Sequence, residues 1–261
     1  MTIVKHELRQ GRTAFLIWTG SIGFLLAVCI FLFPEMKGEM DSVSSLFSSM
    51  GAFTAAFGMD RLNFGTLTGY YAIECGNVLG LGGAFYASLC AVGMLSKEEK
   101  DRTAEFLLTH PVSRTRIITE KLVSVLIRIT VLNGAAWLLS AGSIAAVGEA
   151  VPWKELNLLH LAYFLMQLEL AGICFGISAF MRRGSLGVGL GLAAMMYFLN
   201  LIANITDSAA FLATVTPFGY CGGADIVTNG SLDAGRVAFG MAAGIAAAAA
   251  AYLKYAGKDI H

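Results

Sequence analysis

Long apolar stretches separated by short polar segments dominate the pattern along this chain. Each stretch is about 20 residues long, and a helix of that length rises about 30 Å, the thickness of the hydrocarbon core of a bilayer. The pattern therefore predicts an all-α integral membrane protein, in which residues 1–261 form a single transmembrane domain. The six predicted spans are Thr13–Phe33, Tyr71–Leu95, Leu122–Val147, Leu158–Met181, Leu186–Ile205 and Val237–Tyr255.

Composition excludes a water-soluble fold. Hydrophobic residues make up 56% of the chain and charged residues only 14%, whereas an average soluble domain has about 25% charged residues. The formal net charge is zero, so the total charge indicates neither a nucleic acid nor an acidic partner. We expect the lipid bilayer to be the solvent of this chain.

The distribution of Lys and Arg predicts the orientation, because these residues stay preferentially on the cytoplasmic side. Both termini and the second and fourth loops carry thirteen cations, and the remaining loops carry four. We therefore expect a multi-pass protein of the cytoplasmic membrane with both termini in the cytoplasm. The cations of the richer set are Lys5, Arg9, Arg12, Lys97, Lys100, Arg102, Arg114, Arg116, Lys121, Arg182, Arg183, Lys254 and Lys258, and the others are Lys37, Arg61, Lys154 and Arg236.

The segment Ser42–Met59 is moderately apolar, contains several Ser, Thr and Gly residues, and is flanked by Asp41 and Asp60. We interpret it as a membrane-surface or re-entrant segment on the outer side. The alternative, a seventh span, would invert every later loop and break the charge bias.

The N-terminus has an amphipathic pattern. Val4, Leu8 and Phe15 fall on one helical face, while Lys5 and Arg9 face elsewhere. This pattern predicts a short helix that lies along the cytoplasmic membrane surface and bends into the first span. The alternative is a frayed cytoplasmic tail.

The loop Ser96–Lys121 is the only predicted cytoplasmic loop long enough to form structure of its own. Thr103 can cap a short helix with Leu107 and Leu108 on one face, and Pro111 limits that helix. An exposed apolar face of this kind favours a protein partner, although the two leucines can also fold back onto the bilayer surface. After the proline, Ser113 can cap a second helix that continues into the third span.

The run EKDRTAEFLLTHPVSRTRIITEKL (Glu99–Leu122) resembles the first cytoplasmic loop of the type 2 family of ABC transporter permeases. That loop has an acidic stretch, a Glu-Leu-Leu helix, Pro-Val-Ser-Arg and a Lys that enters the next span. Arg102 stands where the family commonly has Gly, a departure from its pattern just before Thr103. The matching positions are Glu105, Leu107, Leu108, Pro111, Val112, Ser113, Arg114 and Lys121.

Three looser features agree with the same family. Met1–Arg12 is similar to its basic elbow helix, and Thr216–Gly230 is similar to its Pro-Phe segment outside the membrane before the last span. The ending Lys258-Asp259-Ile260 is similar to its basic-Asp ending. The resemblance covers most of the chain in order.

The resemblance implies the permease subunit of an ATP-driven exporter. The loop between the second and third spans would form a coupling helix that docks on a cytoplasmic ABC ATPase, present in two copies. A second permease chain, identical or a similar paralogue, would complete a dimer. The implied ATPase-coupling interface is Thr103, Glu105, Phe106, Leu107, Leu108, Thr109, His110, Pro111, Val112, Ser113, Arg114 and Arg116.

ATP and Mg are expected on that partner ATPase and no cofactor on this chain. No G-x-x-x-x-G-K-[ST] motif occurs in the sequence, and its four histidines lie in separate segments with no HExxH pattern. The five cysteines are scattered without a CxxC pair. These patterns predict no catalytic site and no metal site, so the chain is not expected to be an enzyme by itself.

Two ionisable residues lie at predicted membrane depth, where charge is costly: Arg128 in the third span and Glu169 in the fourth. They are candidates for a polar spot that lines a substrate path. The competing interpretation is a structural ion pair or interhelical bond, since these two helices are sequential and antiparallel.

Two other functional classes stay open at this stage. A self-contained secondary transporter or channel needs ion-coupling residues at the midplane, for which only Arg128 and Glu169 qualify. A non-transporting membrane subunit that keeps the permease fold and acts as a sensor or immunity factor is the second open class. No short motif identifies the transported substrate.

Overall fold

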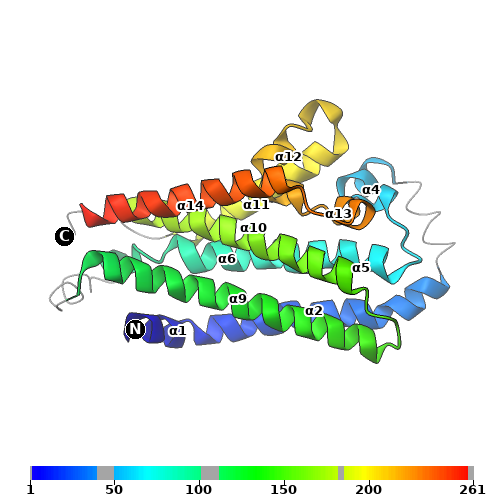
Figure 1. The fold of residues 1–261 in the computed structure, drawn as a ribbon, viewed down its shortest axis with the longest axis horizontal. Helices are drawn as coiled ribbons and strands as arrows, with labels where there is room; N and C mark the ends of the chain where they lie inside the picture. The colour runs from blue at the N-terminus through cyan, green and yellow to red at the C-terminus, as the bar shows by residue number, and fades with distance from the viewer. Residues whose placement is uncertain (1, 40–49, 101–111, 182–184, 258–261) are drawn as a thin grey trace.

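The computed structural model of the chain describes residues 2–39, 50–100, 112–181 and 185–257. Long helices run side by side along one axis and form an elongated bundle (Figure 1). The first helix and the end of the last helix lie at the same end of this bundle, which we call the terminal end.

Six helical segments are long and apolar enough to cross a membrane, which confirms the prediction of an all-α membrane protein with six spans. The described residues contain no β-strand. The second span consists of three consecutive helical pieces that together cover Leu67–Val92. The spans are α2 (Arg12–Gly38), α5 (Leu67–Cys75) with η2 (Gly76–Leu81) and α6 (Gly82–Val92), α9 (Arg114–Ala146), α10 (Trp153–Phe180), α11 (Leu186–Ile205) and α14 (Ala234–Ala256).

Several helices extend beyond the predicted spans, and α9 does so by the most residues. α9 begins at Arg114 rather than at Leu122, because the Ser113 hydroxyl accepts a hydrogen bond from the Arg116 backbone N–H (3.3 Å) and caps a helix that starts before the apolar run. The predicted capping role of Ser113 is therefore confirmed. α2 continues past Phe33, with Pro34 inside the helix.

α10 and α14 pack more closely than side chains of ordinary size allow. A Cβ atom at Gly172 would lie 2.6 Å from the Gly244 carbonyl oxygen, and one at Gly176 would lie 2.7 Å from the Ala247 carbonyl oxygen. Small residues at a helix interface let two backbones approach, and van der Waals packing then holds the helices together in lipid. Gly172 and Gly176 are therefore packing residues.

The second span is interrupted by the π-helical turn η2. The aromatic ring of Tyr163 on α10 fits against this turn, because Gly76 and Gly80 have no side chains there. The Gln167 amide donates to the carbonyl oxygen of Leu79 in the same turn (3.4 Å) and accepts a hydrogen bond from the Asn133 amide of α9 (2.7 Å). Three spans are thus tied together by polar contacts in the middle of the bundle.

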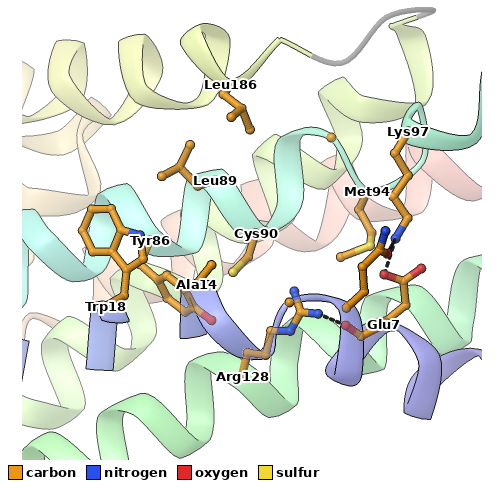
Figure 2. Close-up of a pocket in the computed structure, with 13 residues that line it drawn as sticks. Glu7, Ala14, Trp18, Tyr86, Leu89, Cys90, Met94, Lys97, Arg128 and Leu186 are labelled. Atoms are coloured by element: carbon orange, nitrogen blue, oxygen red, sulfur yellow. Dashed lines mark hydrogen bonds and ion pairs between the residues drawn. The ribbon is translucent and has the colours of Figure 1, made fainter. Parts of the chain in front are cut away.

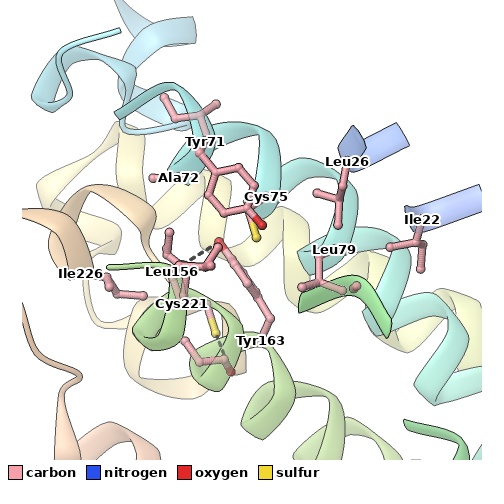
Figure 3. Close-up of a cluster of buried hydrophobic side chains, with 14 of the residues drawn as sticks. Ile22, Leu26, Tyr71, Ala72, Cys75, Leu79, Leu156, Tyr163, Cys221 and Ile226 are labelled. Carbon is pink, nitrogen blue, oxygen red and sulfur yellow. Dashed lines mark hydrogen bonds between the residues drawn. The ribbon is translucent and has the colours of Figure 1, made fainter. Parts of the chain in front are cut away.

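The segment between α11 and α14 folds back into the bundle. The Thr216 hydroxyl donates to the carbonyl oxygen of Met196, halfway along α11 (2.8 Å), and the Tyr163 hydroxyl donates to that of Cys221 (3.0 Å). Figure 3 shows Tyr163 and Cys221 in the buried cluster together with Cys75. The Pro-Phe segment thus packs against α10 and α11, while its predicted position outside the membrane stays a prediction. Its elements are η3 (Asp207–Ala209), α12 (Leu212–Val215), η4 (Pro217–Tyr220) and α13 (Gly223–Asn229).

Part of the predicted re-entrant segment Ser42–Met59 lies outside the described residues. The described part contains α4 (Ala52–Ala56), followed by η1 (Met59–Arg61). α4 lies at the end opposite the terminal end (Figure 1). Its Ala56 carbonyl accepts a hydrogen bond from the Asn204 amide near the end of α11 (2.9 Å). A helix of five residues is too short to cross a bilayer.

Candidate functional site

The first helix, α1 (Thr2–Gln10), occupies the residues predicted to form the surface helix. Its N-terminus is capped from a distant part of the chain, because one Glu120 carboxylate oxygen on α9 accepts hydrogen bonds from the backbone N–H groups of Ile3 (3.0 Å) and Val4 (3.3 Å). A carboxylate at this position satisfies free N–H groups and complements the helix dipole. α1 is therefore fixed to α9, whereas its position on a membrane surface stays a prediction.

A buried lysine joins three parts of the chain at the terminal end. The Lys121 side chain is 1% exposed, and its ammonium donates to the carbonyl oxygen of Met94 (2.6 Å) and forms an ion pair with Glu98. Its nitrogen also lies 3.9 Å from a carboxylate oxygen of Glu7. A buried charge needs such partners, because desolvation of an unpaired ammonium costs several kcal/mol. Lys121 thus holds α1 and the end of the second span against α9.

A second lysine completes the connection. Lys97, the first residue of α7 (Lys97–Lys100), forms an ion pair with Glu7 and donates to the Gln10 side chain (2.9 Å). Figure 2 shows Glu7 pointing from α1 toward Lys97. Glu7 is 3% exposed, so it faces the inside of this contact rather than solvent.

Arg116 also pairs with Glu120 (2.9 Å), whose carboxylate caps α1. Three carboxylates and three cations therefore form one group of charged side chains around α1. We call it the elbow charge cluster; its members are Glu7, Lys97, Glu98, Arg116, Glu120 and Lys121. Lys97 and Glu98 precede residues 101–111, and Arg116, Glu120 and Lys121 follow them. The cluster therefore fixes both sides of the predicted coupling segment to α1.

Most of the residues predicted to couple to an ATPase lie outside the described part of the chain. The described ones stand at the start of α9, where the Arg114 guanidinium donates to the Tyr255 carbonyl oxygen at the end of α14 (3.3 Å). The predicted coupling residues outside the described part are Thr103, Glu105, Phe106, Leu107, Leu108, Thr109, His110 and Pro111, and those within it are Val112, Ser113, Arg114 and Arg116.

Arg128 lies next to Gly11, the single residue between α1 and α2. Its guanidinium donates to the backbone carbonyl of Glu7 and packs against Gly11, where a Cβ atom would lie 2.7 Å from Nη1. The side chain is 8% exposed, and it lines a cavity of about 520 Å³. Figure 2 shows the guanidinium pointing from α9 into this space.

Glu169 has different surroundings. It is 4% exposed and accepts a hydrogen bond from the Tyr220 hydroxyl of η4 (2.9 Å). Its carboxylate occupies the space over Gly240 of α14. The predicted ion pair between Arg128 and Glu169 is not formed among the described contacts, because the two side chains leave their helices toward different neighbours.

The contact between Tyr220 and Glu169 gives the first testable prediction. Burial raises the pKa of the Tyr220 phenol, which therefore stays protonated and donates to the carboxylate. Tyr220→Phe removes the donor and leaves the buried carboxyl unsatisfied, so we expect a loss of about 1–3 kcal/mol in the free energy of unfolding. Denaturant titration of the detergent-solubilised protein measures it.

Tyr252→Phe is the matched control. The Tyr252 hydroxyl also makes one hydrogen bond to a side chain, Thr119 (3.0 Å), but that bond is exposed. We expect its loss to change stability by less than about 0.5 kcal/mol. Equal stability losses in the two variants would contradict a structural role of the buried contact.

Sequence reasoning missed several interhelical polar contacts. The Tyr71 hydroxyl lies 2.8 Å from Ser140 Oγ and 2.8 Å from His160 Nε2, so one buried group joins α5, α9 and α10. It also missed Glu7 and Lys97, which look like ordinary members of a cytoplasmic charge run. No local signal distinguishes them, since their partners are distant along the chain.

The comparisons with known proteins agree with the fold. No curated protein matches the chain. The model of the family described as ABC-2 family transporter protein matches residues 1–217, which include the first five spans and both sides of the predicted coupling segment. The resemblance to type 2 ABC permeases is thereby confirmed, and the chain belongs to the ABC-2 family of transporter proteins.

Proposed function

We propose that the chain is the permease subunit of an ABC exporter, which moves a substrate out across the cytoplasmic membrane by alternating access. The observation that carries the proposal is the family match over residues 1–217, supported by six membrane-length helices. A separate ATPase subunit powers the movement, because the sequence contains no P-loop motif.

The proposed complex contains two copies of the cytoplasmic ATPase, which bind ATP and Mg, and a second permease chain. That second chain is either another copy of this protein or a similar paralogue. Both termini face the cytoplasm in this arrangement, as the distribution of Lys and Arg predicts. The terminal end of the bundle is then the cytoplasmic end.

The elbow charge cluster supports a route for coupling. In the proposal, the predicted coupling interface between Thr103 and Arg116 docks on the ATPase and moves with it when ATP brings the two ATPases together. Lys97 and Lys121 stand on either side of this segment and both contact Glu7. A displacement of the segment is therefore transmitted to α1, and through Gly11 to α2. α1 and α2 then have two positions, one for each position of the docked segment, and ATP shifts the populations of these two states.

A pull-down tests the docking surface. We expect Leu107→Asp/Leu108→Asp to reduce the amount of co-purifying ATPase at least about tenfold, because charge on a docking face costs more than about 1.4 kcal/mol. The tagged protein is purified in detergent, the masses of co-purifying chains are determined, and ATPase activity is measured.

The matched control is Phe211→Asp/Val215→Asp, which also places two acidic residues at exposed apolar positions. Phe211 is 67% and Val215 55% exposed, and they lie at the two ends of α12, far from the terminal end (Figure 1). The control should retain the ATPase. Full retention by the Leu107/Leu108 variant would refute the docking assignment.

The same experiment distinguishes the rival functions. A pure protein that transports without an ATPase partner would indicate a secondary transporter, with Arg128 and Glu169 as its first candidate residues. An ATPase partner whose activity no transported compound stimulates would indicate a sensor or immunity subunit of the same fold.

A further inference from the structure

The cavity beside Arg128 is built from separate parts of the chain at the terminal end. Its volume is about 520 Å³, within the range of about 300–1,000 Å³ that ligand sites occupy. Its walls are formed by the junction of α1 and α2 at Gly11, by α6 and the residues after it, by α9 and by the start of α11. The cavity therefore depends on the folded arrangement of four spans.

The walls change from polar to apolar with depth. Glu7, Lys97 and Arg128 lie on the side nearer the terminal end, while Trp18 and Tyr86 lie on the other side (Figure 2). Trp18 follows Gly11 by seven residues, which corresponds to about 10 Å along a helix. A ligand with a charged head and an apolar tail matches this gradient.

The guanidinium of Arg128 lacks an anionic partner. Among the described residues it makes no ion pair, and the oxygen that accepts its hydrogen bond is the backbone carbonyl of Glu7. The Glu7 carboxylate is instead engaged by Lys97 and lies within 3.9 Å of Lys121. Nε of Arg128 is buried without any acceptor in the described part of the chain. A charge at membrane depth without a counter-charge is costly, so an anion stabilises it.

A second buried donor borders the same space. The Tyr86 side chain is 2% exposed, and no oxygen or nitrogen atom of the described residues accepts a hydrogen bond from its hydroxyl, whose polar neighbour is the Cys90 thiol. Its ring packs against Trp18 (6.0 Å between ring centroids) and Phe15 (6.4 Å). Aromatic rings with one polar atom are typical of the boundary between headgroups and acyl chains. Arg128 and Tyr86 are thus two hydrogen-bond donors that border the same cavity.

We propose that this cavity binds the headgroup phosphate of an anionic phospholipid from the leaflet at the terminal end of the bundle. The planar guanidinium matches the oxygens of a phosphate, and basic pockets between spans are known to bind anionic headgroups. The aromatic wall receives the first part of an acyl chain. Leu186 borders the cavity and is 59% exposed, so the site has a side toward the surrounding lipid. The site goes beyond the proposed function and does not depend on it.

Quenching of Trp18 fluorescence tests the proposal in the full chain. The chain has three tryptophans, so Trp137→Phe/Trp153→Phe leaves Trp18 as the only one. The protein is reconstituted in phosphatidylcholine vesicles in which either phosphatidylglycerol or phosphatidylcholine carries bromine near the headgroup. We expect brominated phosphatidylglycerol to reach half-maximal quenching at a mole fraction about fivefold lower than brominated phosphatidylcholine does. A factor of about five is the preference expected from one cation near an anionic lipid.

Arg128→Gln should reduce this preference to a ratio near one, while leaving quenching by brominated phosphatidylcholine unchanged. Arg12→Gln is the matched control, because Arg12 is exposed and does not line the cavity. It should keep the preference. The same fivefold preference in the Arg128→Gln variant would overturn the proposal, because the preference for phosphatidylglycerol would then come from the general surface charge of the protein and not from Arg128.

Two further measurements keep the proposal falsifiable if Arg128→Gln does not fold. Ala14→Phe fills the cavity from α2 while keeping Arg128, and it should abolish the preference; its persistence would refute the cavity as the site. Millimolar inorganic phosphate should not change the preference. Its loss on addition of phosphate would overturn the lipid assignment, because the site would then bind a soluble phosphate compound.

Discussion

Lys121→Met is expected to lower the free energy of unfolding by about 3–5 kcal/mol, the cost of removing one partner from a buried ion pair. The Lys121 side chain is 1% exposed, and its partner Glu98 is 13% exposed. Without the Lys121 ammonium, the Glu98 carboxylate and the Met94 carbonyl oxygen, both at the terminal end of the bundle, lose their hydrogen-bond donor. Denaturant titration in detergent measures the loss.

Lys37→Met controls for the loss of a lysine as such. Lys37 pairs with Glu149 (3.0 Å), but the two side chains are 52% and 34% exposed. A pair of that kind contributes about 0–1 kcal/mol. Similar losses in Lys121→Met and Lys37→Met would show that the elbow charge cluster does not stabilise the fold.

The double variant Lys121→Met/Glu98→Gln separates pairing from packing. A neutral Gln does not need a cation, so we expect the second substitution to restore part of the stability lost in Lys121→Met. In the proposed mechanism, Lys121→Met also weakens the link between the coupling segment and α1, so transport per ATP hydrolysed should fall in the assembled complex. Unchanged coupling in a correctly folded variant would remove Lys121 from the proposed route.

Gly172→Leu is expected to separate α10 from α14 and to lower stability by about 3 kcal/mol, the upper end of the roughly 1–3 kcal/mol that overpacking usually costs. The obstructing atom is the carbonyl oxygen of Gly244, which lies 2.6 Å from the position that a Cβ would take at Gly172. Because that atom is backbone, α14 itself must move. The loss is measured by denaturant titration and by the amount of folded protein recovered from membranes.

Gly142→Leu is the matched control on α9. A Cβ there meets no heavy atom within 4 Å in the described structure. Leu has a higher helix propensity than Gly by roughly 0.8 kcal/mol, so this variant should be as stable as the original protein or slightly more stable. Equal destabilisation at both positions would mean that close packing of α10 and α14 is not what Gly172 provides.

The two variants test different properties of the bundle. Gly172 lies where two spans pack backbone to backbone, which favours a rigid pair. Lys121 lies where α1, the second span and α9 meet through charged side chains at the terminal end. In the proposed mechanism, this charged end is the part of the bundle that follows the ATPase.

Local patterns in the amino-acid sequence are sufficient for the six spans, the all-α class and the helix start at Ser113. A run of about 20 apolar residues has to form a helix in lipid, because no water is present there to satisfy its backbone groups. A serine side chain caps the helix that begins next to it. The family resemblance was also visible, since residues 99–122 form one continuous motif.

Which charged residues meet depends instead on the packing of the whole bundle. Glu7 and Lys97 are 90 residues apart along the chain and form an ion pair, while Arg128 and Glu169, on sequential spans, do not form the predicted pair. Helical periodicity places a side chain on a face of its helix, but the neighbour of that face depends on how all spans pack. The same reason explains why the fold-back of Thr216 onto α11 and the cavity beside Arg128 emerge only in the tertiary structure.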